Sequence, residues 1–142
     1  MLMARILVID DSVSVLDWIQ QILGQAGHET AVASSGKQGG RLLKEGRMDL
    51  VITDIYMPDQ DGFDVIRQVR QLAPQTPVIA MSSREPESHM LAAARAMGAA
   101  STLQKPFSAQ QLLKTVGDLL GSPPGASLSR YDAAAILWPS TP

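Results

Sequence analysis

Cysteine is absent from the 142 residues of the chain. Disulfide bonds, thiolate nucleophiles and zinc sites built from thiolates are therefore excluded, and the absence is typical of a reducing compartment. Aromatic residues are scarce as well, with two each of Trp, Tyr and Phe. A hydrophobic core must therefore consist mainly of Leu, Ile, Val, Met and Ala.

Long apolar runs and basic runs are also missing. The apolar stretch Ile6–Ile9 is too short for a membrane span or for the apolar segment of a signal peptide. The formal net charge is −2, from 12 basic and 14 acidic side chains, and the basic residues form no run. Electrostatic attraction to nucleic acid is therefore not expected. We expect a cytoplasmic protein that binds neither nucleic acid nor a membrane.

The length and the hydrophobic content of 45% are typical of a single domain, which at this size buries roughly 68–70% of the surface of its unfolded chain. Ser122, Pro123, Pro124 and Gly125 break any helix that reaches them. We expect residues 4–121 to form the domain. Residues 122–142, rich in Ser, Pro and Ala, should form a flexible tail.

Short apolar runs alternate with longer amphipathic stretches along the domain. This alternation is typical of strand and helix units wound around a parallel sheet. The helices are indicated by apolar residues at intervals of three and four and by a closing glycine; they include residues 12–26 and 87–97. The predicted strands cover residues 5–10, 28–33, 49–54, 77–82 and 102–104.

Two helices begin with the spacing of a capping box, at Ser35 with Gln38 and at Ser108 with Gln111. The first of them also contains Gly39–Gly40. Each glycine costs about 1 kcal/mol relative to alanine inside a helix. We therefore expect the helix that follows Ser35 to be short or frayed.

Four of the five predicted strands end in polar or charged residues: Asp10 and Asp11, then Asp54, then Ser82 and Ser83, and finally Gln104 and Lys105 with Pro106. In an open parallel sheet, ligands bind outside the carboxyl ends of the strands. Taken singly, these residues have ordinary explanations, since Asp11 or Ser12 can cap a helix and Asp54 can begin a turn. Their common position predicts a site.

Three converging carboxylates repel one another, by about 4 kcal/mol for a pair 4 Å apart at an effective dielectric near 20. Lys105 alone cannot balance them. A hard divalent cation such as Mg²⁺ can, since it binds carboxylates, water and phosphate oxygens. A carboxylate is also a covalent acceptor in phosphoryl transfer, which makes Asp54 the candidate nucleophile. The three phosphoryl oxygens could then meet the metal, Lys105 and the Ser82 hydroxyl.

Four segments in this order also resemble a known family. They are Ile6–Asp11, Asp49–Asp54 with the Met57, Pro58, Asp61 and Gly62 that follow, Pro77–Ser82, and Lys105–Phe107. Over residues 5–121 the chain is similar to the receiver domain of bacterial two-component response regulators. The resemblance implies a flavodoxin-like α/β fold: a doubly wound, five-stranded parallel sheet of strand order 2-1-3-4-5 with five helices.

The same resemblance implies the chemistry of the site. Asp54 would take a phosphoryl group from a histidine kinase or a phosphotransfer protein, and the phosphorylated form would bind an unknown downstream protein differently. Ser82 and Lys105 would contact the phosphoryl group, and the peptide before Pro106 would be cis. The Mg²⁺ ligands would be Asp10, Asp11, Asp54 and the backbone carbonyl of Tyr56. Such a domain is a signalling module, a monomer or weak dimer, and not an enzyme for external substrates.

The chain departs from the family at Thr102, three residues before the lysine, where an aromatic side chain is usual. The usual aromatic rotation cannot report phosphorylation here. Because the sequence shows no output domain beside the receiver domain, three roles remain open: a diffusible regulator like those of chemotaxis, a phosphorelay intermediate or phosphate sink with no output of its own, and a receiver taken from a longer chain.

Two functions of other classes fit less well. A phosphatase that forms an aspartyl phosphate would need a second Asp two residues after the first, where this chain has Tyr56 and Ser12. A flavin-binding module would need a phosphate loop rich in Ser, Thr and Gly after the first strand. Asp10 and Asp11 would repel that phosphate.

Overall fold

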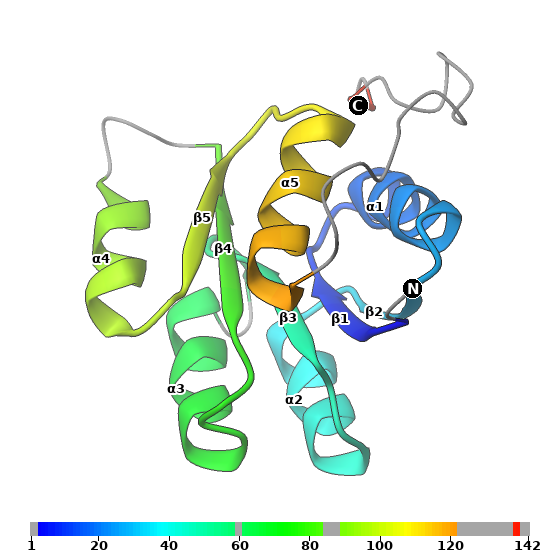
Figure 1. Cartoon of the computed structure of the whole chain (residues 1–142). Coiled ribbons are helices and arrows are strands. Elements are labelled where there is room, and N and C mark those ends of the chain that lie inside the picture. Colours follow the sequence, from blue (N-terminus) through cyan, green and yellow to red (C-terminus); the bar gives the residue numbers. More distant parts are fainter. Residues whose placement is uncertain (1–2, 59–60, 84–88, 122–137, 140–142) are drawn as a thin grey trace.

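The computed structural model describes residues 3–58, 61–83, 89–121 and 138–139. Ten elements alternate between strand and helix, as the sequence predicts (Figure 1). Residues 87–88 of the predicted fourth helix, and 122–137 and 140–142 of the predicted tail, lie outside the described residues. The elements are β1 Arg5–Ile9, α1 Val13–Gln25, β2 Glu29–Ala33, α2 Gly36–Glu45, β3 Leu50–Asp54, α3 Gly62–Leu72, β4 Val78–Ser82, α4 Met90–Met97, β5 Ser101–Gln104 and α5 Ala109–Leu120.

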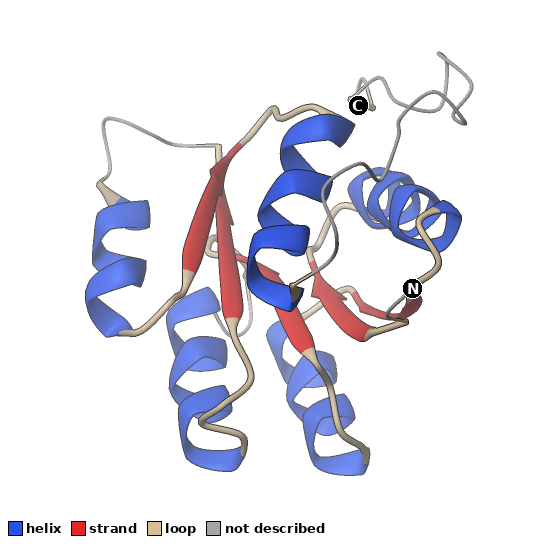
Figure 2. Cartoon of the chain, viewed as in Figure 1, coloured by secondary structure: helices blue, strands red, loops and turns tan. Residues whose placement is uncertain are grey.

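The five strands form one sheet in the order β2-β1-β3-β4-β5, and every neighbouring pair is parallel (Figure 2). This confirms the predicted flavodoxin-like order 2-1-3-4-5. The order reverses around β1, because the chain moves from β1 outward to β2 and then returns to the other side of β1 as β3. All five strands therefore present their carboxyl ends at the same edge of the sheet.

Helices cover both faces of the sheet and enclose two hydrophobic cores (Figure 1). In β1, Ile6 and Val8 belong to the core under α1 and α5, whereas Leu7 and Ile9 belong to the core under α2, α3 and α4. Side chains alternate between the faces of a strand, so burial on both sides requires a continuous apolar run. In the described part of the chain, no helix combines the length and apolar character needed to cross a membrane.

The N-terminal caps confirm one predicted capping box and correct the other. At the start of α5, Gln111 N donates to Ser108 Oγ at 3.0 Å, and Ser108 N donates to Gln111 Oε1 at 2.8 Å. At the start of α2, Gln38 N donates to Ser35 Oγ at 3.1 Å, but Gln38 Oε1 accepts from Ser34 N at 2.9 Å. The second box is therefore incomplete, because the glutamine side chain reaches one residue too far back.

The glycines of α2 do not shorten the helix, contrary to the prediction. The helix continues through Gly39 and Gly40 to Glu45, and both glycines are buried. A Cβ atom at Gly39 would collide with the side chain of Ile9, and one at Gly40 would lie 2.8 Å from Oε1 of Gln68. The glycines let α2 pack closely against β1 and α3, and this packing offsets their low helix propensity.

Gly62, the first residue of α3, packs closely against the backbone at the end of β3, and this close packing can be tested by mutation. A Cβ atom there would lie 2.5 Å from the carbonyl oxygen of Asp54 and 2.8 Å from Cα of Ile55. We expect Gly62→Ala to lower the free energy of unfolding, measured by urea denaturation, by about 1–3 kcal/mol, because the backbone must shift. Gly24→Ala is the matched control, since nothing lies within 4 Å of its Cβ. It should raise stability by up to about 1 kcal/mol. Equal effects would contradict the close approach.

Candidate functional site

The register of the sheet brings the acidic residues together at its carboxyl edge. Ile9 of β1 pairs with Thr53 of β3. Asp10 follows Ile9 and Asp54 follows Thr53, so these two residues lie side by side. Asp10 N donates to the carbonyl of Ala33 at 3.1 Å, which extends the pairing of β1 with β2 by one residue. The backbone therefore places these two carboxylates next to each other.

Asp10, Asp11 and Asp54 form an acidic cluster in which one carboxylate oxygen from each residue lies within 4.8 Å of the others. Asp10 is fully buried and Asp54 is 6% exposed, whereas Asp11 is exposed. The three carboxylates among the four predicted metal ligands thus meet, with Asp11 on the side open to solvent. Hard oxygen donors around an excess of negative charge are the surroundings that Mg²⁺ prefers, so the residues present fit this ion.

Lys105 joins the cluster from the end of β5. Its Nζ atom lies 2.5 Å from Oδ2 of Asp10 and 3.4 Å from Oδ2 of Asp54, and its side chain is only 10% exposed. Lys105 N donates to the carbonyl of Ser82 at 2.9 Å, which ties this residue to the end of β4. The peptide between Lys105 and Pro106 is cis, as the resemblance implies.

The other predicted site residues lie at the ends of the same strands. Asp54 pairs with Met81, so Ser82 lies one residue further along β4 in the direction of the carboxyl edge, and it is fully buried. Tyr56 follows two residues after Asp54 and packs, half-buried, against the core under α2, α3 and α4. Both residues are therefore near the edge where the carboxylates meet.

Two groups that hold the cluster were not recognised as part of the site from the sequence. The sequence predicts Ser12 as a possible helix cap, and it does cap α1, with Val15 N donating to its Oγ at 3.4 Å. Its backbone N–H also donates to Oδ1 of Asp10 at 2.9 Å. The hydroxyl of the buried Thr53 donates to the carbonyl of Asp54 at 3.0 Å. The sequence offered one signal for Thr53, which is a hydroxyl side chain within an otherwise apolar strand.

Burial dominates the electrostatics of the cluster. It raises the pKa of Asp54 from 3.8 to about 6, with the nearby Asp10 charge adding to the effect and Lys105 opposing it. Burial also raises the pKa of Asp10, again against the influence of Lys105. One ammonium group therefore does not compensate three carboxylates, and a bound cation would relieve the remaining repulsion.

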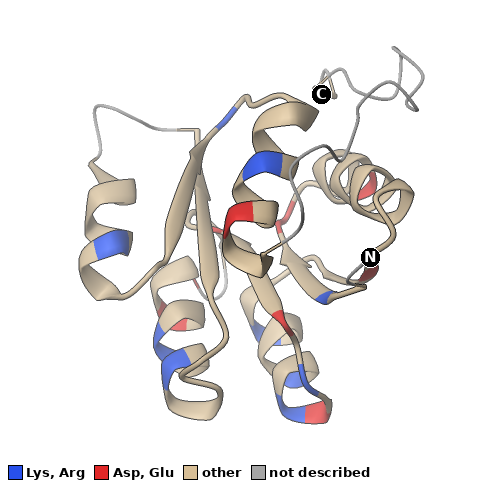
Figure 3. Ribbon diagram, viewed as in Figure 1, with Lys and Arg blue, Asp and Glu red and all other residues tan. Residues whose placement is uncertain are grey.

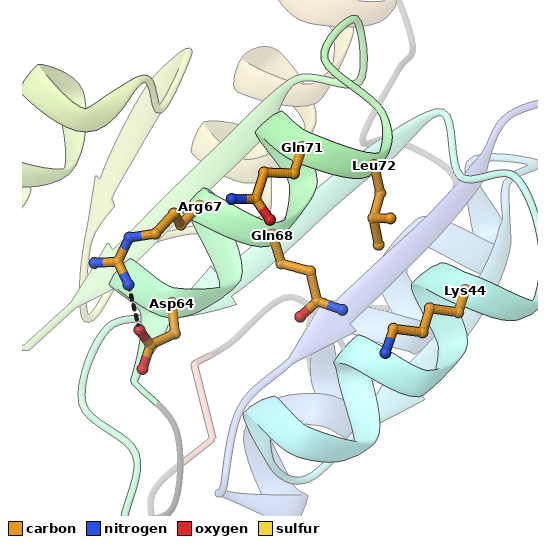
Figure 4. Close-up of a pocket in the computed structure, with 6 residues that line it drawn as sticks. All are labelled: Lys44, Asp64, Arg67, Gln68, Gln71 and Leu72. Atoms are coloured by element: carbon orange, nitrogen blue, oxygen red, sulfur yellow. Dashed lines mark hydrogen bonds and ion pairs between the residues drawn. The ribbon is translucent and has the colours of Figure 1, made fainter.

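A pocket between α2 and α3 is a second candidate site (Figure 4). It is lined by Lys44, Asp64, Arg67, Gln68, Gln71 and Leu72. Its carboxylate already forms an ion pair with a guanidinium, Asp64 with Arg67 at 2.8 Å, and both side chains are exposed. Exposed pairs of this kind are common surface features. The acidic cluster is therefore the stronger candidate for chemistry.

Basic side chains of the described residues are spread over the molecule and do not gather on one element (Figure 3). They occur on α2, α3, α4 and α5. Some are paired with acids on the same helix, as Lys114 is with Asp118 at 3.0 Å. Nucleic-acid interfaces usually carry Lys and Arg clustered on one face.

Comparison with known proteins gives one consistent family. Residues 6–117 match the profile of the response regulator receiver domain. The chain is 35% identical over 120 residues to the DNA-binding transcriptional regulator NtrC of a Bradyrhizobium strain, covering 83% of this chain and 24% of that protein. It is 34% identical over 120 residues to protein PilH of Pseudomonas aeruginosa, covering 83% of this chain and 98% of that one. The chain thus spans about a quarter of the NtrC relatives and nearly all of PilH.

Solved structures agree with the sequence relatives. The chemotaxis response regulator CheY4 of Vibrio cholerae is 30% identical with a TM-score of 0.75, covering 83% of this chain and 99% of that one. A response regulator receiver domain protein from Clostridium thermocellum is 33% identical with a TM-score of 0.78, covering 84% and 95%. The fold is therefore shared with these proteins.

The raised pKa of Asp54 predicts how stability depends on pH when a chelator keeps metal away. Between about pH 4 and 6 the folded protein retains a proton on Asp54 that the unfolded chain has lost, so the contribution of Asp54 to stability falls as the pH rises. We expect Asp54→Asn to remove this loss. Its advantage over the wild type in free energy of unfolding should grow from near zero at pH 4 to on the order of 3 kcal/mol at pH 7.

The matched control for this measurement is Asp118→Asn, which removes an exposed carboxylate paired with Lys114. Its effect should stay within about 1 kcal/mol at every pH, because exposed ion pairs contribute little. An Asp54→Asn advantage that does not change between pH 4 and pH 7 would contradict the assignment of a raised pKa.

Proposed function

The chain belongs to the response regulator receiver domain family, and on that basis we propose that Asp54 accepts a phosphoryl group from a histidine kinase or a phosphotransfer protein. The observation that carries this proposal is the position of Asp54. Its carboxylate ends β3 at the carboxyl edge of the sheet, is 6% exposed, and lies beside Asp10 and 3.4 Å from the ammonium of Lys105. A nucleophile and the charges that stabilise its product are thus adjacent.

Each residue of the site has a role in this reaction. A carboxylate oxygen of Asp54 forms a bond to phosphorus as the bond between phosphorus and the donor's histidine nitrogen breaks, and the released imidazole takes up a proton. Lys105 and the hydroxyl of Ser82 stabilise the negative charge on the phosphoryl oxygens. Asp10, Asp11, Asp54 and the backbone carbonyl of Tyr56 would hold Mg²⁺, which supplies positive charge where three carboxylates and the phosphoryl group meet.

The proposed output is a change in protein binding. Phosphorylation replaces the single negative charge of the Asp54 carboxylate with the roughly two charges of a phosphoryl group and adds three strong acceptor oxygens, in a site that is mostly buried. The side chains of Lys105 and Ser82 must move to contact this group. Ser82 ends β4 and Lys105 follows β5, so their movement affects the ends of these two strands. We propose that the adjustment alters the binding of a downstream protein by the domain of residues 4–121, in the cytoplasm. The acyl phosphate is then hydrolysed in place, so the chain acts on no external substrate.

A role as a phosphorelay intermediate or phosphate sink is the second candidate, and Thr102 favours it. Thr102 lies half-buried in β5 and pairs with Ala80 of β4. A small hydroxyl side chain cannot make the large rotation of an aromatic ring, so the usual path from the site to the outer face of β5 is missing. Return of the phosphoryl group from Asp54 to a phosphotransfer histidine, without capture of another protein, would support this role.

Chemical phosphorylation tests the main proposal. Incubation with Mg²⁺ and acetyl phosphate should add one phosphoryl group to the wild-type chain, measured by intact-mass spectrometry, because a small acyl phosphate can replace the protein donor. Asp54→Asn should give no adduct, and Asp118→Asn should behave as the wild type, since this side chain is exposed on α5. An unmodified wild type, or an adduct that persists in Asp54→Asn, would contradict the assignment of Asp54.

Replacement of Lys105 tests how the nucleophile is controlled. Lys105 lowers the pKa of Asp54 and lies beside the charge that develops on transfer. We expect Lys105→Met to slow adduct formation by about 10²- to 10³-fold. The pH at half-maximal rate should also move upward, because Asp54 loses the cation that favours its ionised form. Lys105→Arg should restore part of the rate. A pH profile identical to the wild type would remove Lys105 from the mechanism.

A further inference from the structure

Three aromatic rings from distant parts of the chain meet on the side of the sheet covered by α1 and α5. The ring centroid of Trp138 lies 5.0 Å from that of Trp18 and 4.7 Å from that of Phe107, and the Trp18 and Phe107 centroids are 5.7 Å apart. The interplanar angles of 57°, 63° and 69° are tilted or edge-to-face arrangements, which aromatic pairs prefer. Half of the six aromatic residues of the chain therefore form one cluster.

The three rings are not equivalent. Trp18, on α1, and Phe107, just before α5, are 6% and 3% exposed and belong to the core. Trp138 is only half-buried and packs onto the outside of that core. In Figure 1 residues 138–139, drawn in red, lie near the first turn of α5, in agreement with the contact between Trp138 and Phe107. Trp138 also lies beyond residues 6–117, the part that matches the family. The contact is thus an addition to the shared domain.

We propose that Trp18 and Phe107 form a docking site for the C-terminal segment of the same chain, with Trp138 as its anchor. The site selects an aromatic side chain because two rings set at an angle form its walls, and a third ring meets both of them edge to face. While Trp138 is docked, this surface is covered. Another protein that binds α1 and the start of α5 at this point must displace Trp138 first.

The docking site lies on two segments that also reach the acidic cluster. Phe107 follows Lys105 by two residues, and Trp18 lies on α1, whose cap Ser12 donates its N–H to Asp10. The docking itself needs no phosphoryl group, however. The docking proposal goes beyond the proposed function, and its tests use unphosphorylated protein. Failure of the docking proposal would therefore not imply failure of the phosphoacceptor proposal, nor would the reverse hold.

Trp fluorescence of full-length variants tests the proposal directly. Trp138→Ala and Trp138→Phe both leave Trp18 as the sole tryptophan, so they report on the same fluorophore. We expect the acrylamide quenching constant of Trp18 to be about twofold higher in Trp138→Ala, because the phenylalanine ring keeps the cover that alanine removes. Circular dichroism should show the same helix content in both variants. Equal quenching constants would overturn the docking site.

The converse variant observes the anchor itself. Trp18→Phe leaves Trp138 as the sole tryptophan and keeps a ring at position 18. Its emission should be shifted to shorter wavelength, and its quenching reduced, relative to a free peptide of residues 133–142. Adding Phe107→Leu should move both values toward those of the peptide. Emission from Trp138 identical to that of the peptide would also overturn the proposal.

Dilution separates docking within one chain from exchange between two copies. A segment tethered to its own site has an effective concentration that does not depend on the protein concentration. The protection of Trp138 in Trp18→Phe should therefore persist over a dilution of about a hundredfold. Protection that is lost on dilution would assign the docked Trp138 to a second copy and overturn docking in the same chain.

Discussion

The ammonium of Lys105 lies between two buried carboxylates, 2.5 Å from Asp10 and 3.4 Å from Asp54, and the arrangement of this end of the molecule depends on it. Burial of each charge costs several kcal/mol, so such groups persist only where they are paired and hydrogen-bonded. Ser12 contributes one such hydrogen bond to Asp10. The pairing is incomplete, because Asp11 adds a third carboxylate. The remaining excess of negative charge favours binding of a cation, and a bound cation would also balance the charge of a phosphoryl group on Asp54.

The sheet holds these charges close together because rigid structure surrounds them. β1, β3 and β4 are buried on both faces between two cores, so their ends have little freedom to separate when the carboxylates repel. Close backbone packing continues beyond the strands, where Gly62 lies against the carbonyl of Asp54. The stability of the apolar layers thus offsets the electrostatic strain at the edge, which is the usual relation between a scaffold and a functional site.

The relatives contain this domain in chains of different length. The part that this chain matches makes up nearly all of PilH and about a quarter of the NtrC proteins. Thr102, on which the proposed phosphorelay role depends, lies on β5 within the matched part. Trp138 lies outside that part and contacts Trp18 and Phe107 on the side of α1 and α5.

Much of the fold and of the site follows from short stretches of sequence. Apolar runs, helical periodicity and caps are encoded within a few residues, so the strands, the parallel order implied by the resemblance, and the meeting of Asp10, Asp54 and Lys105 were all predictable. The prediction that Gly39 and Gly40 would shorten α2 was wrong, because the close packing that these glycines allow involves Ile9 and Gln68, which belong to other elements. The contact of Trp138 with Trp18 and Phe107, the second role of Ser12 and the degree of burial of each carboxylate were decided only by tertiary structure. They depend on which distant segments pack together, and no local pattern contains that information.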